Sequence, residues 1–209
     1  MKSKQKLRIL IADDHLILRM GLVTLLENAG DMEVVGEAED GEEAVREALR
    51  LRPDVVIMDL VMPGLDGTAA TERIKAKEPE IKILILTTFG TSDIISKALG
   101  NGADGALLKN SPQHELLAAI RTIADGTRVI SKDVQEIIDA DPPAQALSPR
   151  QKEILDLIVR GFSNADIASH FGISVTVVKE HLVALYHKID ASNRTEAVAI
   201  ALRKHLLKI

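Results

Sequence analysis

The stretch at residues 55–67, VVIMDLVMPGLDG, constrains the fold of this chain more than any other. Four apolar residues run directly into Asp59, and a Met-Pro-Gly turn follows shortly after it. A continuous run of Val, Ile and Met is typical of a parallel strand that is covered on both faces. Asp59 is therefore expected at the carboxyl end of a buried strand, which is the edge where open parallel sheets bind ligands.

Similar apolar runs alternate with amphipathic segments through the first part of the chain. The predicted strands lie at residues 7–12, 32–38, 55–58, 81–86 and 104–108, and a helix is predicted after each of them. Strands and helices that alternate at short spacing favour a parallel sheet with helices on both faces. We therefore predict an α/β domain of the flavodoxin-like (βα)₅ type at residues 1–128. A linker is predicted at residues 129–146, with room for a short helix at 134–138.

Residues 147–209 are predicted to form an all-α domain of four helices. Ser148 and Gln151 form a capping box with proline at the first helical position. A short helix from Ser163, a glycine turn and a longer helix from Ser174 to about Ile189 make a helix-turn-helix. A fourth helix follows Asn193. Its apolar residues serve either a dimer face or the domain core: Ala197, Val198, Ile200, Ala201 and Leu202.

Composition narrows the classes of protein that fit. The chain has no cysteine, which excludes disulfides and thiolate metal sites, and no apolar window is long enough to cross a bilayer. We expect a cytoplasmic protein. From residue 147 onward nine basic and six acidic residues give +3, while the remainder carries −8 of the total −5. This asymmetry indicates two domains with different partners.

Polar residues follow the last apolar position of four predicted strands: Asp13 and Asp14, Asp59, Thr87, and Lys109. Because these strand ends converge in a doubly wound sheet, three carboxylates are expected close together, and a hard cation such as Mg²⁺ relieves their repulsion. A carboxylate can act as a nucleophile and become an aspartyl phosphate. Lys109 and the Thr87 hydroxyl are placed to bind the phosphoryl oxygens.

Each of these residues also has a structural interpretation. Asp14 can simply cap the helix that follows it, Thr87 can be an ordinary strand-end residue, and Lys109 can be a solvated charge. Asp59 is harder to explain in this way, because a buried strand rarely ends on a carboxylate without a use for it. Taken jointly, the residues favour a site.

Residues from about 6 to 126 resemble the receiver domain of bacterial two-component response regulators, through LIADDH, VVIMDLVMPGLDG, ILILTT and GADGALLKN. The resemblance implies that Asp59 is the phosphoacceptor for a sensor histidine kinase. It implies that Asp13, Asp14, Asp59 and the Val61 carbonyl bind Mg²⁺, and that Thr87 and Lys109 read the phosphoryl group. One position departs from the family. Ala106 stands where an aromatic residue usually reports phosphorylation, and Phe89 is a candidate substitute.

Residues 147–207 resemble the DNA-binding domain of the LuxR/NarL type of response regulator, through LSPRQKEILDLIVRGFSNADIASHFGIS and NRTEAVAIA. The helix from Ser174 would then be the recognition helix in the major groove. The DNA contacts predicted from this resemblance are Thr176, Lys179, Glu180, His181 and Lys188. Val183 and Ala184 occupy turns where polar or basic residues are common in the family, and His187 is expected to pack or to lie on the surface.

The sequence thus predicts a DNA-binding transcriptional regulator controlled by phosphorylation, which dimerises when Asp59 is phosphorylated. An alternative is a rear domain that serves only dimerisation or protein interaction. Another is DNA binding that is independent of phosphorylation, which Ala106 would explain. A Mg²⁺-dependent phosphohydrolase is disfavoured, because Val61 stands where such enzymes carry a second carboxylate and no general acid is apparent.

Overall fold

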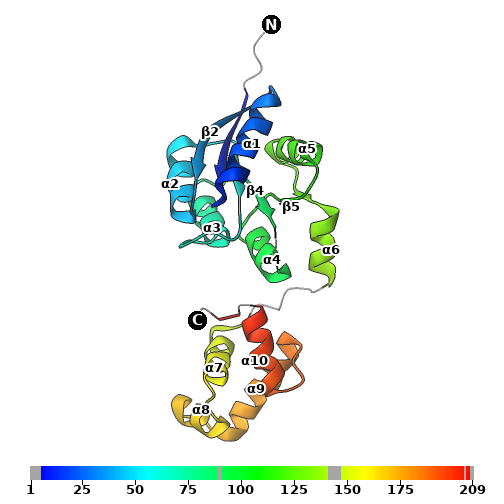
Figure 1. Cartoon of the computed structure of the whole chain (residues 1–209). Helices are drawn as coiled ribbons and strands as arrows, with labels where there is room; N and C mark the ends of the chain where they lie inside the picture. The colour runs from blue at the N-terminus through cyan, green and yellow to red at the C-terminus, as the bar shows by residue number, and fades with distance from the viewer. Residues whose placement is uncertain (1–5, 89–90, 141–146, 205, 208–209) are drawn as a thin grey trace. The chain divides into compact units, whose positions relative to one another are not determined.

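The computed structural model describes residues 6–88, 91–140, 147–204 and 206–207, without the side chain of Arg203. The chain divides into a front unit, residues 1–142, and a rear unit, residues 143–209 (Figure 1). The predicted α/β front domain and helical rear domain are both confirmed. Each unit is described separately below.

In the described part of the chain, the front unit contains a parallel sheet of six strands in the order β2-β1-β3-β4-β5-β6. The strands are β1 (Leu7–Ala12), β2 (Met32–Ala38), β3 (Val55–Met58), β4 (Lys82–Thr87), β5 (Gly105–Leu108) and β6 (Val129–Ile130). The helices are α1 (Leu16–Asn28), α2 (Gly41–Leu51), α3 (Gly67–Lys77), α4 (Ser92–Gly100), α5 (Gln113–Ala124) and α6 (Lys132–Ala140). The strand order reverses at β1 and β3, so the switch point that favours ligand binding lies between these two strands.

Alternate residues along each central strand feed two separate cores. In β3, Val55 and Ile57 pack with α1 and α5 on one face, while Val56 and Met58 pack with α2, α3 and α4 on the other. Successive side chains of a strand point to opposite faces, so a strand buried on both faces must be apolar throughout. This explains the uninterrupted apolar run before Asp59.

Gly67 fixes the loop that follows Asp59. A Cβ atom at this position would lie 1.9 Å from the carbonyl oxygen of Asp59, and the Gly67 amide donates to the Leu60 carbonyl at 3.0 Å. Only glycine permits this close approach of the two backbones. Asp66 then caps α3 by accepting from the Ala69 amide at 2.8 Å.

The predicted linker at residues 129–146 begins with regular structure that belongs to the front unit. β6 pairs in parallel with β5, with Ala106 opposite Ile130. In α6, Val134 is fully buried in the same core as Ala106, and Ile137 and Ile138 pack against that core. The helix is longer than the one considered at residues 134–138. The sequence placed only the central part of this helix, because its three core-facing apolar residues all lie within 134–138.

The rear unit consists of α7 (Pro149–Val159), α8 (Asn164–Phe171), α9 (Val175–Ile189) and α10 (Arg194–Arg203) around one apolar core. Both halves of the capping box of Ser148 with Gln151 are present. Gly172, at φ +65°, makes the left-handed turn between α8 and α9. Ser174 caps α9 through the Val177 amide at 3.3 Å. The predicted helix-turn-helix is therefore confirmed.

The apolar residues of α10 serve mainly the domain core. Ala197, Ile200 and Ala201 are buried in it, and Val198 packs against it, whereas Leu202 is 48% exposed. The apolar residues of α10 that were considered for a dimer face thus pack inside the unit, apart from Leu202.

We predict that Val134→Ala lowers the free energy of unfolding of the front unit by about 2 kcal/mol, the usual cost of a buried truncation. Urea unfolding measures this change. Glu136→Ala is the matched control on the exposed side of α6, where its ion pair with Lys132 lies in solvent and is worth little. Equal stability of both variants would show that α6 does not pack on the front unit.

Candidate functional site

Backbone hydrogen bonds continue past the strand ends and hold the predicted site residues side by side. The Asp13 amide donates to the Ala38 carbonyl at 3.1 Å, and the Asp59 amide donates to the Ala12 carbonyl at 2.8 Å. The Lys109 amide donates to the Thr87 carbonyl at 2.8 Å. Residues that end neighbouring strands are thereby kept in register at one edge of the sheet.

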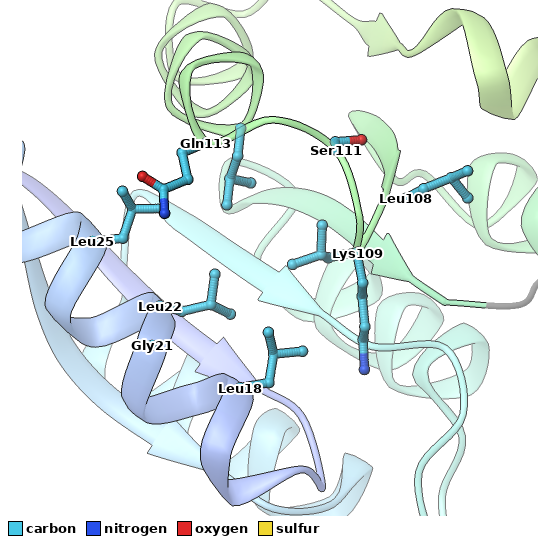
Figure 2. A pocket seen from close by; sticks show the side chains of 10 residues that line it. Leu18, Gly21, Leu22, Leu25, Leu108, Lys109, Ser111 and Gln113 are labelled. Carbon is cyan, nitrogen blue, oxygen red and sulfur yellow. The ribbon is translucent and has the colours of Figure 1, made fainter.

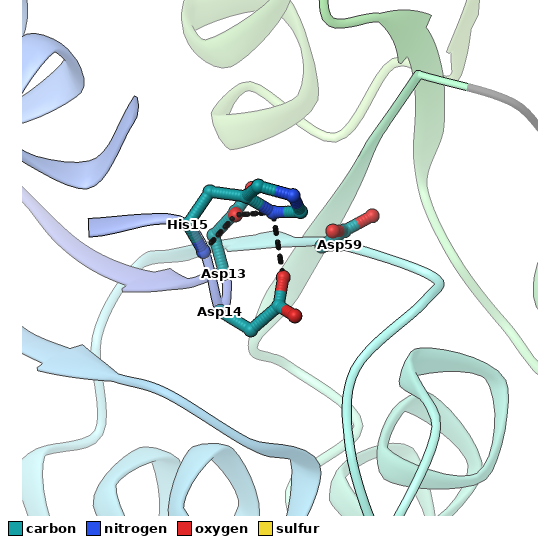
Figure 3. A group of neighbouring side chains, drawn as sticks. All are labelled: Asp13, Asp14, His15 and Asp59. Carbon is teal, nitrogen blue, oxygen red and sulfur yellow. Dashed lines mark hydrogen bonds and ion pairs between the residues drawn. The ribbon is translucent and has the colours of Figure 1, made fainter. Parts of the chain in front are cut away.

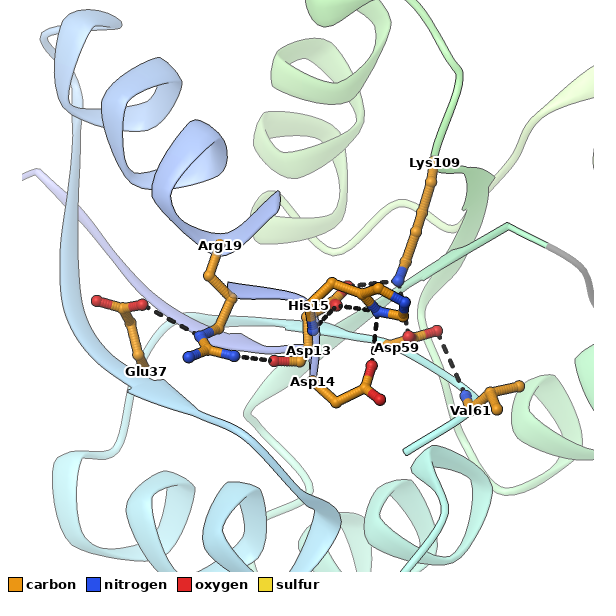
Figure 4. Close-up of polar contacts among 8 residues, drawn as sticks. All are labelled: Asp13, Asp14, His15, Arg19, Glu37, Asp59, Val61 and Lys109. Atoms are coloured by element: carbon orange, nitrogen blue, oxygen red, sulfur yellow. Dashed lines mark hydrogen bonds and ion pairs between the residues drawn. The ribbon is translucent and has the colours of Figure 1, made fainter. Parts of the chain in front are cut away.

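Asp59 lies in a buried ion-pair network at this edge (Figure 4). The Nζ atom of Lys109 is 2.7 Å from Oδ2 of Asp59 and 2.6 Å from Oδ2 of Asp13. The side chains of Asp13, Asp59 and Lys109 are 3%, 4% and 8% exposed. Oδ1 of Asp59 accepts from the Val61 amide at 3.3 Å. Two carboxylates thus share one ammonium group out of contact with most of the solvent.

Burial raises the pKa of the Asp59 carboxyl above its usual value, and the charge of Asp13 adds to this effect. The hydrogen bond and the charge of Lys109 oppose the rise without cancelling it. Burial also acts to lower the pKa of Lys109, but its hydrogen bonds to Asp13 and Asp59 outweigh burial and raise it. Lys109 therefore stays charged, and the site carries an excess of negative charge that a cation would neutralise.

Lys109 reaches this network from an apolar cavity of about 220 Å³ between α1 and α5 (Figure 2). Leu18, Leu22 and Leu25 of α1 line the cavity together with the stem of Lys109. A lysine can bury its methylene stem among leucines while its charged end reaches a polar site.

Thr87 ends β4 beside Asp59 and is 1% exposed. Its Oγ1 atom is buried and has no hydrogen-bond partner among the residues that the structure describes. An unsatisfied buried hydroxyl is costly and calls for an explanation. Thr87, Thr88, Asp59, Val61 and His15 line one pocket of about 310 Å³. The hydroxyl is therefore available to a group that enters this pocket.

Asp14 is the exposed member of the acidic cluster and does not cap α1. His15 is the residue before the helix, and no side chain caps it. Instead, Nδ1 of His15 lies 2.6 Å from Oδ1 of Asp14 and 3.1 Å from Oδ1 of Asp13 (Figure 3). The predicted capping role of Asp14 is thus wrong, because His15 takes the N-cap position and the Asp14 carboxylate pairs with its imidazole.

The side chains at this edge fit a hard cation. One ligand atom each from Asp13, Asp14, His15 and Asp59 lie within 4.8 Å of one another. Carboxylate oxygens are the ligands that Mg²⁺ prefers. The Thr87 hydroxyl, which lacks a hydrogen-bond partner among the described residues, faces the same group of side chains. The acidic cluster is therefore compatible with Mg²⁺ binding.

Arg19 and His15 belong to this edge and were missed in the sequence. The buried guanidinium of Arg19 donates to the Asp13 carbonyl at 2.6 Å and pairs with Glu37 at 3.3 Å (Figure 4). It also pairs with Glu39 at 2.5 Å. It thereby fixes the backbone of Asp13. The sequence signal that could have identified Arg19 is its position as a basic residue within an otherwise apolar helix.

Ala106, at the usual aromatic position, is fully buried. It packs in the core that also contains Val134 of α6. Side chains of α6 therefore share the core with Ala106, and β6 pairs with its strand. Phe89, considered as a substitute, lies outside the described residues.

In the rear unit, α9 presents one exposed face. Three of the predicted DNA contacts lie on it, Thr176, Lys179 and Glu180, together with the exposed Val183, Ala184 and His187. These positions recur at three- and four-residue steps, so they share one side of the helix. His187 is exposed, as expected. We call these six residues the α9 face.

His181 and Lys188 are not on the α9 face. Both are half-buried, and Nζ of Lys188 lies 3.4 Å from Oε1 of Gln151 on α7. The structure therefore brings together three of the five predicted DNA contacts and sets these two apart. Lys188 links α9 to α7.

Comparison with known proteins agrees with both units. Residues 9–121 match the family described as response regulator receiver domain, and residues 145–201 match the bacterial regulatory proteins of the luxR family. The oxygen regulatory protein NreC of Staphylococcus aureus is 39% identical, over 97% of this chain and 100% of the relative. NreC of Staphylococcus epidermidis is 40% identical over the same shares.

Solved structures give the same result. The response regulator ChrA of a heme-sensing two-component system is 36% identical, covers 97% of this chain and 99% of its own, and superposes with a TM-score of 0.58. The complex of the response regulator RcsB with DNA is 27% identical, with coverage of 95% and 98% and a TM-score of 0.69.

The fold and the strand-end cluster thus define a two-component response regulator with a receiver domain and a DNA-binding domain. The chain belongs to the luxR family of these proteins, which are transcription regulators. This is a class of regulators and not of enzymes. Among the helices that the structure describes, none has the length and apolar composition needed to cross a membrane.

We predict that Asp59→Asn stabilises the metal-free protein at neutral pH. A carboxyl with a raised pKa in the folded state binds protons more readily there than in the unfolded chain, so stability falls as the pH rises from the ordinary value of 3.8 through the folded pKa. The advantage of the variant should therefore be small near pH 3.8 and fully developed above the folded pKa. Urea unfolding in the presence of a chelator measures it.

The matched control is Asp54→Asn at the opposite end of β3, where the carboxylate is exposed and accepts a hydrogen bond from the Arg8 amide, at 2.8 Å. This variant should show no stabilisation that grows with pH. A metal-free Asp59→Asn protein that is less stable than wild type at neutral pH would contradict the electrostatic description of the site.

For the α9 face, we predict that Lys179→Ala weakens binding to all duplexes by a similar factor, because an exposed lysine contacts phosphate. The slope of log K against log salt concentration should become shallower by about 0.9, the contribution of one phosphate contact. Lys188→Ala is the matched comparison. A slope that changes with Lys188 and not with Lys179 would show that another side of α9 faces DNA.

Proposed function

We propose that this protein is a transcriptional regulator whose DNA binding is controlled by phosphorylation of Asp59. The observation that carries the proposal is the pairing, in one pocket, of the buried Asp59 carboxylate, whose pKa is raised, with the buried Thr87 hydroxyl, which has no hydrogen-bond partner among the described residues. The first supplies an acceptor oxygen, and the second supplies a donor for an oxygen-rich group.

In the proposed reaction, a carboxylate oxygen of Asp59 attacks the phosphorus of a phosphohistidine on a sensor histidine kinase. The new O–P bond forms as the N–P bond breaks, and the bonding electron pair returns to the imidazole of the kinase. Asp59 must be ionised to attack. The ammonium of Lys109 at 2.7 Å keeps a fraction of it ionised despite its burial.

Asp13, Asp14, Asp59 and the Val61 carbonyl would hold the Mg²⁺ ion. When bound, Mg²⁺ neutralises charge on the transferring phosphoryl oxygens and brings them toward the carboxylate. The chain contributes the fixed position of Asp13, which the Arg19 contact to its carbonyl maintains at 2.6 Å. His15 must leave Asp14 for that carboxylate to take part.

Thr87 and Lys109 would then bind the phosphoryl group on Asp59. The Thr87 hydroxyl would gain the hydrogen bond that it lacks, and Lys109 would exchange a carboxylate oxygen for a phosphoryl oxygen. Because Thr87 is 1% exposed, a shift of its side chain displaces packed neighbours. This is how occupancy of the pocket would be transmitted to the rest of the front unit.

The sensor kinase would dock beside this pocket on the start of α1. Leu16, Ile17 and Met20 are 58%, 86% and 60% exposed there, and they follow directly on His15, which lines the pocket. Exposed large apolar side chains that gather in one place mark an interaction surface. The apolar surface would thus bring the phosphohistidine to Asp59.

The proposed output is binding of duplex DNA by a homodimer that forms on phosphorylation. α9 would enter the major groove of each half-site, as the resemblance to the luxR family implies. Two alternatives follow from other observations. Ala106 favours DNA binding that does not depend on phosphorylation, and the weak positive charge of the rear domain favours a dimerisation or protein-interaction role.

A direct test is incorporation of labelled phosphoryl groups from a small-molecule acyl phosphate in the presence of Mg²⁺. We predict that wild type gains one phosphoryl group that base and hydroxylamine remove, as expected of an acyl phosphate, and that Asp59→Asn gains none. Asp66→Asn is the matched control on the same loop, because asparagine caps a helix as well as aspartate does. Label that persists in Asp59→Asn would show that another residue is the acceptor.

A further inference from the structure

The α9 face has an unusual composition for a surface meant to meet DNA. Its middle consists of Val183 and Ala184, and Val183 is 69% exposed. Leu182 and Leu185, which flank this pair, point into the domain core and are buried. The core therefore does not need Val183, and within the unit its side chain meets mainly solvent.

The charges on the α9 face also balance. Lys179 is followed at once by Glu180, and both are exposed. Lysine contacts to phosphate supply affinity without regard to sequence, and an adjacent carboxylate weakens that contribution. The surface at the centre of α9 is thus nearly neutral and apolar, which suits contacts to base edges better than contacts to phosphate.

Several arginines of the rear unit are also engaged inside it. Arg150 lies 3.3 Å from the centre of the Phe171 ring, Arg160 pairs with Asp156 at 2.9 Å, and Arg194 donates to the Phe162 carbonyl. These side chains stabilise the helix packing. Because these three arginines are engaged inside the unit, they do not present a free guanidinium for bidentate hydrogen bonds to guanine.

The major groove contains one apolar group that an aliphatic side chain can recognise, the C5-methyl group of thymine. Cytosine lacks this methyl group, and the purines present only polar atoms at their major-groove edges. An exposed valine in the middle of a recognition helix has no other apolar partner in the groove.

We propose that Val183 reads a thymine C5-methyl group in each half-site, with Ala184 completing the apolar contact. The inference rests on the proposed role of α9 as the recognition helix. Glu180 lies one helical turn before Val183 and, as an acceptor, favours a cytosine N4 amino group near that thymine. The preferred site would thus carry a thymine with a nearby cytosine in each half.

Replacement of thymine by deoxyuridine tests this contact, because it keeps the base pair and removes only the methyl group. Duplexes are first selected from a random pool by the full chain with Mg²⁺ and beryllofluoride. Each thymine of the best duplex is then replaced in turn. We expect about a fourfold loss of affinity at one position in each half-site, the factor that corresponds to burial of one methyl group.

In Val183→Ser the penalty for deoxyuridine at that position should disappear, and in Val183→Ala it should shrink. Leu202→Ser is the matched control, because Leu202 is also an exposed aliphatic residue of the rear unit, at 48%, but lies on α10. It should keep the full penalty. Unchanged thermal unfolding of the variants confirms that they are folded, as expected for exposed positions.

The outcomes separate this inference from the proposed function. If no duplex is selected, the DNA-binding role fails, and the reading of thymine fails with it. If duplexes are selected but no thymine is sensitive to loss of its methyl group, the function stands and the role of Val183 is overturned. A penalty that persists unchanged in Val183→Ser would also overturn it.

Discussion

The front unit is organised around the cost of burying Asp59 next to Asp13. Two carboxylates in a protein interior repel each other and lose their hydration, and the single ammonium group of Lys109 compensates for only part of this cost. The site is therefore stable enough to fold and yet short of positive charge. A bound cation would relieve this imbalance, and in the proposed function a phosphoryl group on Asp59 would shift the charge balance of the site again.

Several structural features serve to impose this arrangement. Backbone hydrogen bonds beyond the strand ends keep Asp13, Asp59 and Lys109 in register, and Gly67 lets the next loop pass against the Asp59 backbone. Lys109 lines the cavity between α1 and α5 and pairs with both buried carboxylates. The clearest local cost in free energy is at Thr87, because its buried hydroxyl lacks a hydrogen-bond partner among the described residues. These features have a common explanation if the pocket takes up a charged group that completes it.

The sequence predicted most of the fold because the signals were local. The apolar runs, the glycine turns and the capping boxes at Ser148 and Ser163 each specify structure within a few residues. It predicted the strand-end cluster because parallel strands bring their carboxyl ends together. Contacts between segments that are distant in the sequence could not be predicted. Examples are the ion pairs of Arg19 with Glu37 and Glu39, and the packing of α6 against the core beside β5. The α9 face required knowledge of which helix side the core takes, so His181 and Lys188 were grouped with residues that point elsewhere.

The most direct test of the central claim is capture of fragmented genomic DNA by the full chain, with and without Mg²⁺ and beryllofluoride, in wild type and in Asp59→Asn. The account predicts sites that are enriched only when wild type carries the phosphoryl mimic, and no such gain in Asp59→Asn. Equal enrichment in both states would contradict phosphorylation control and leave a constitutive DNA-binding protein. Absence of enrichment in every state would contradict the regulator itself and favour a dimerisation or protein-interaction role for the rear unit.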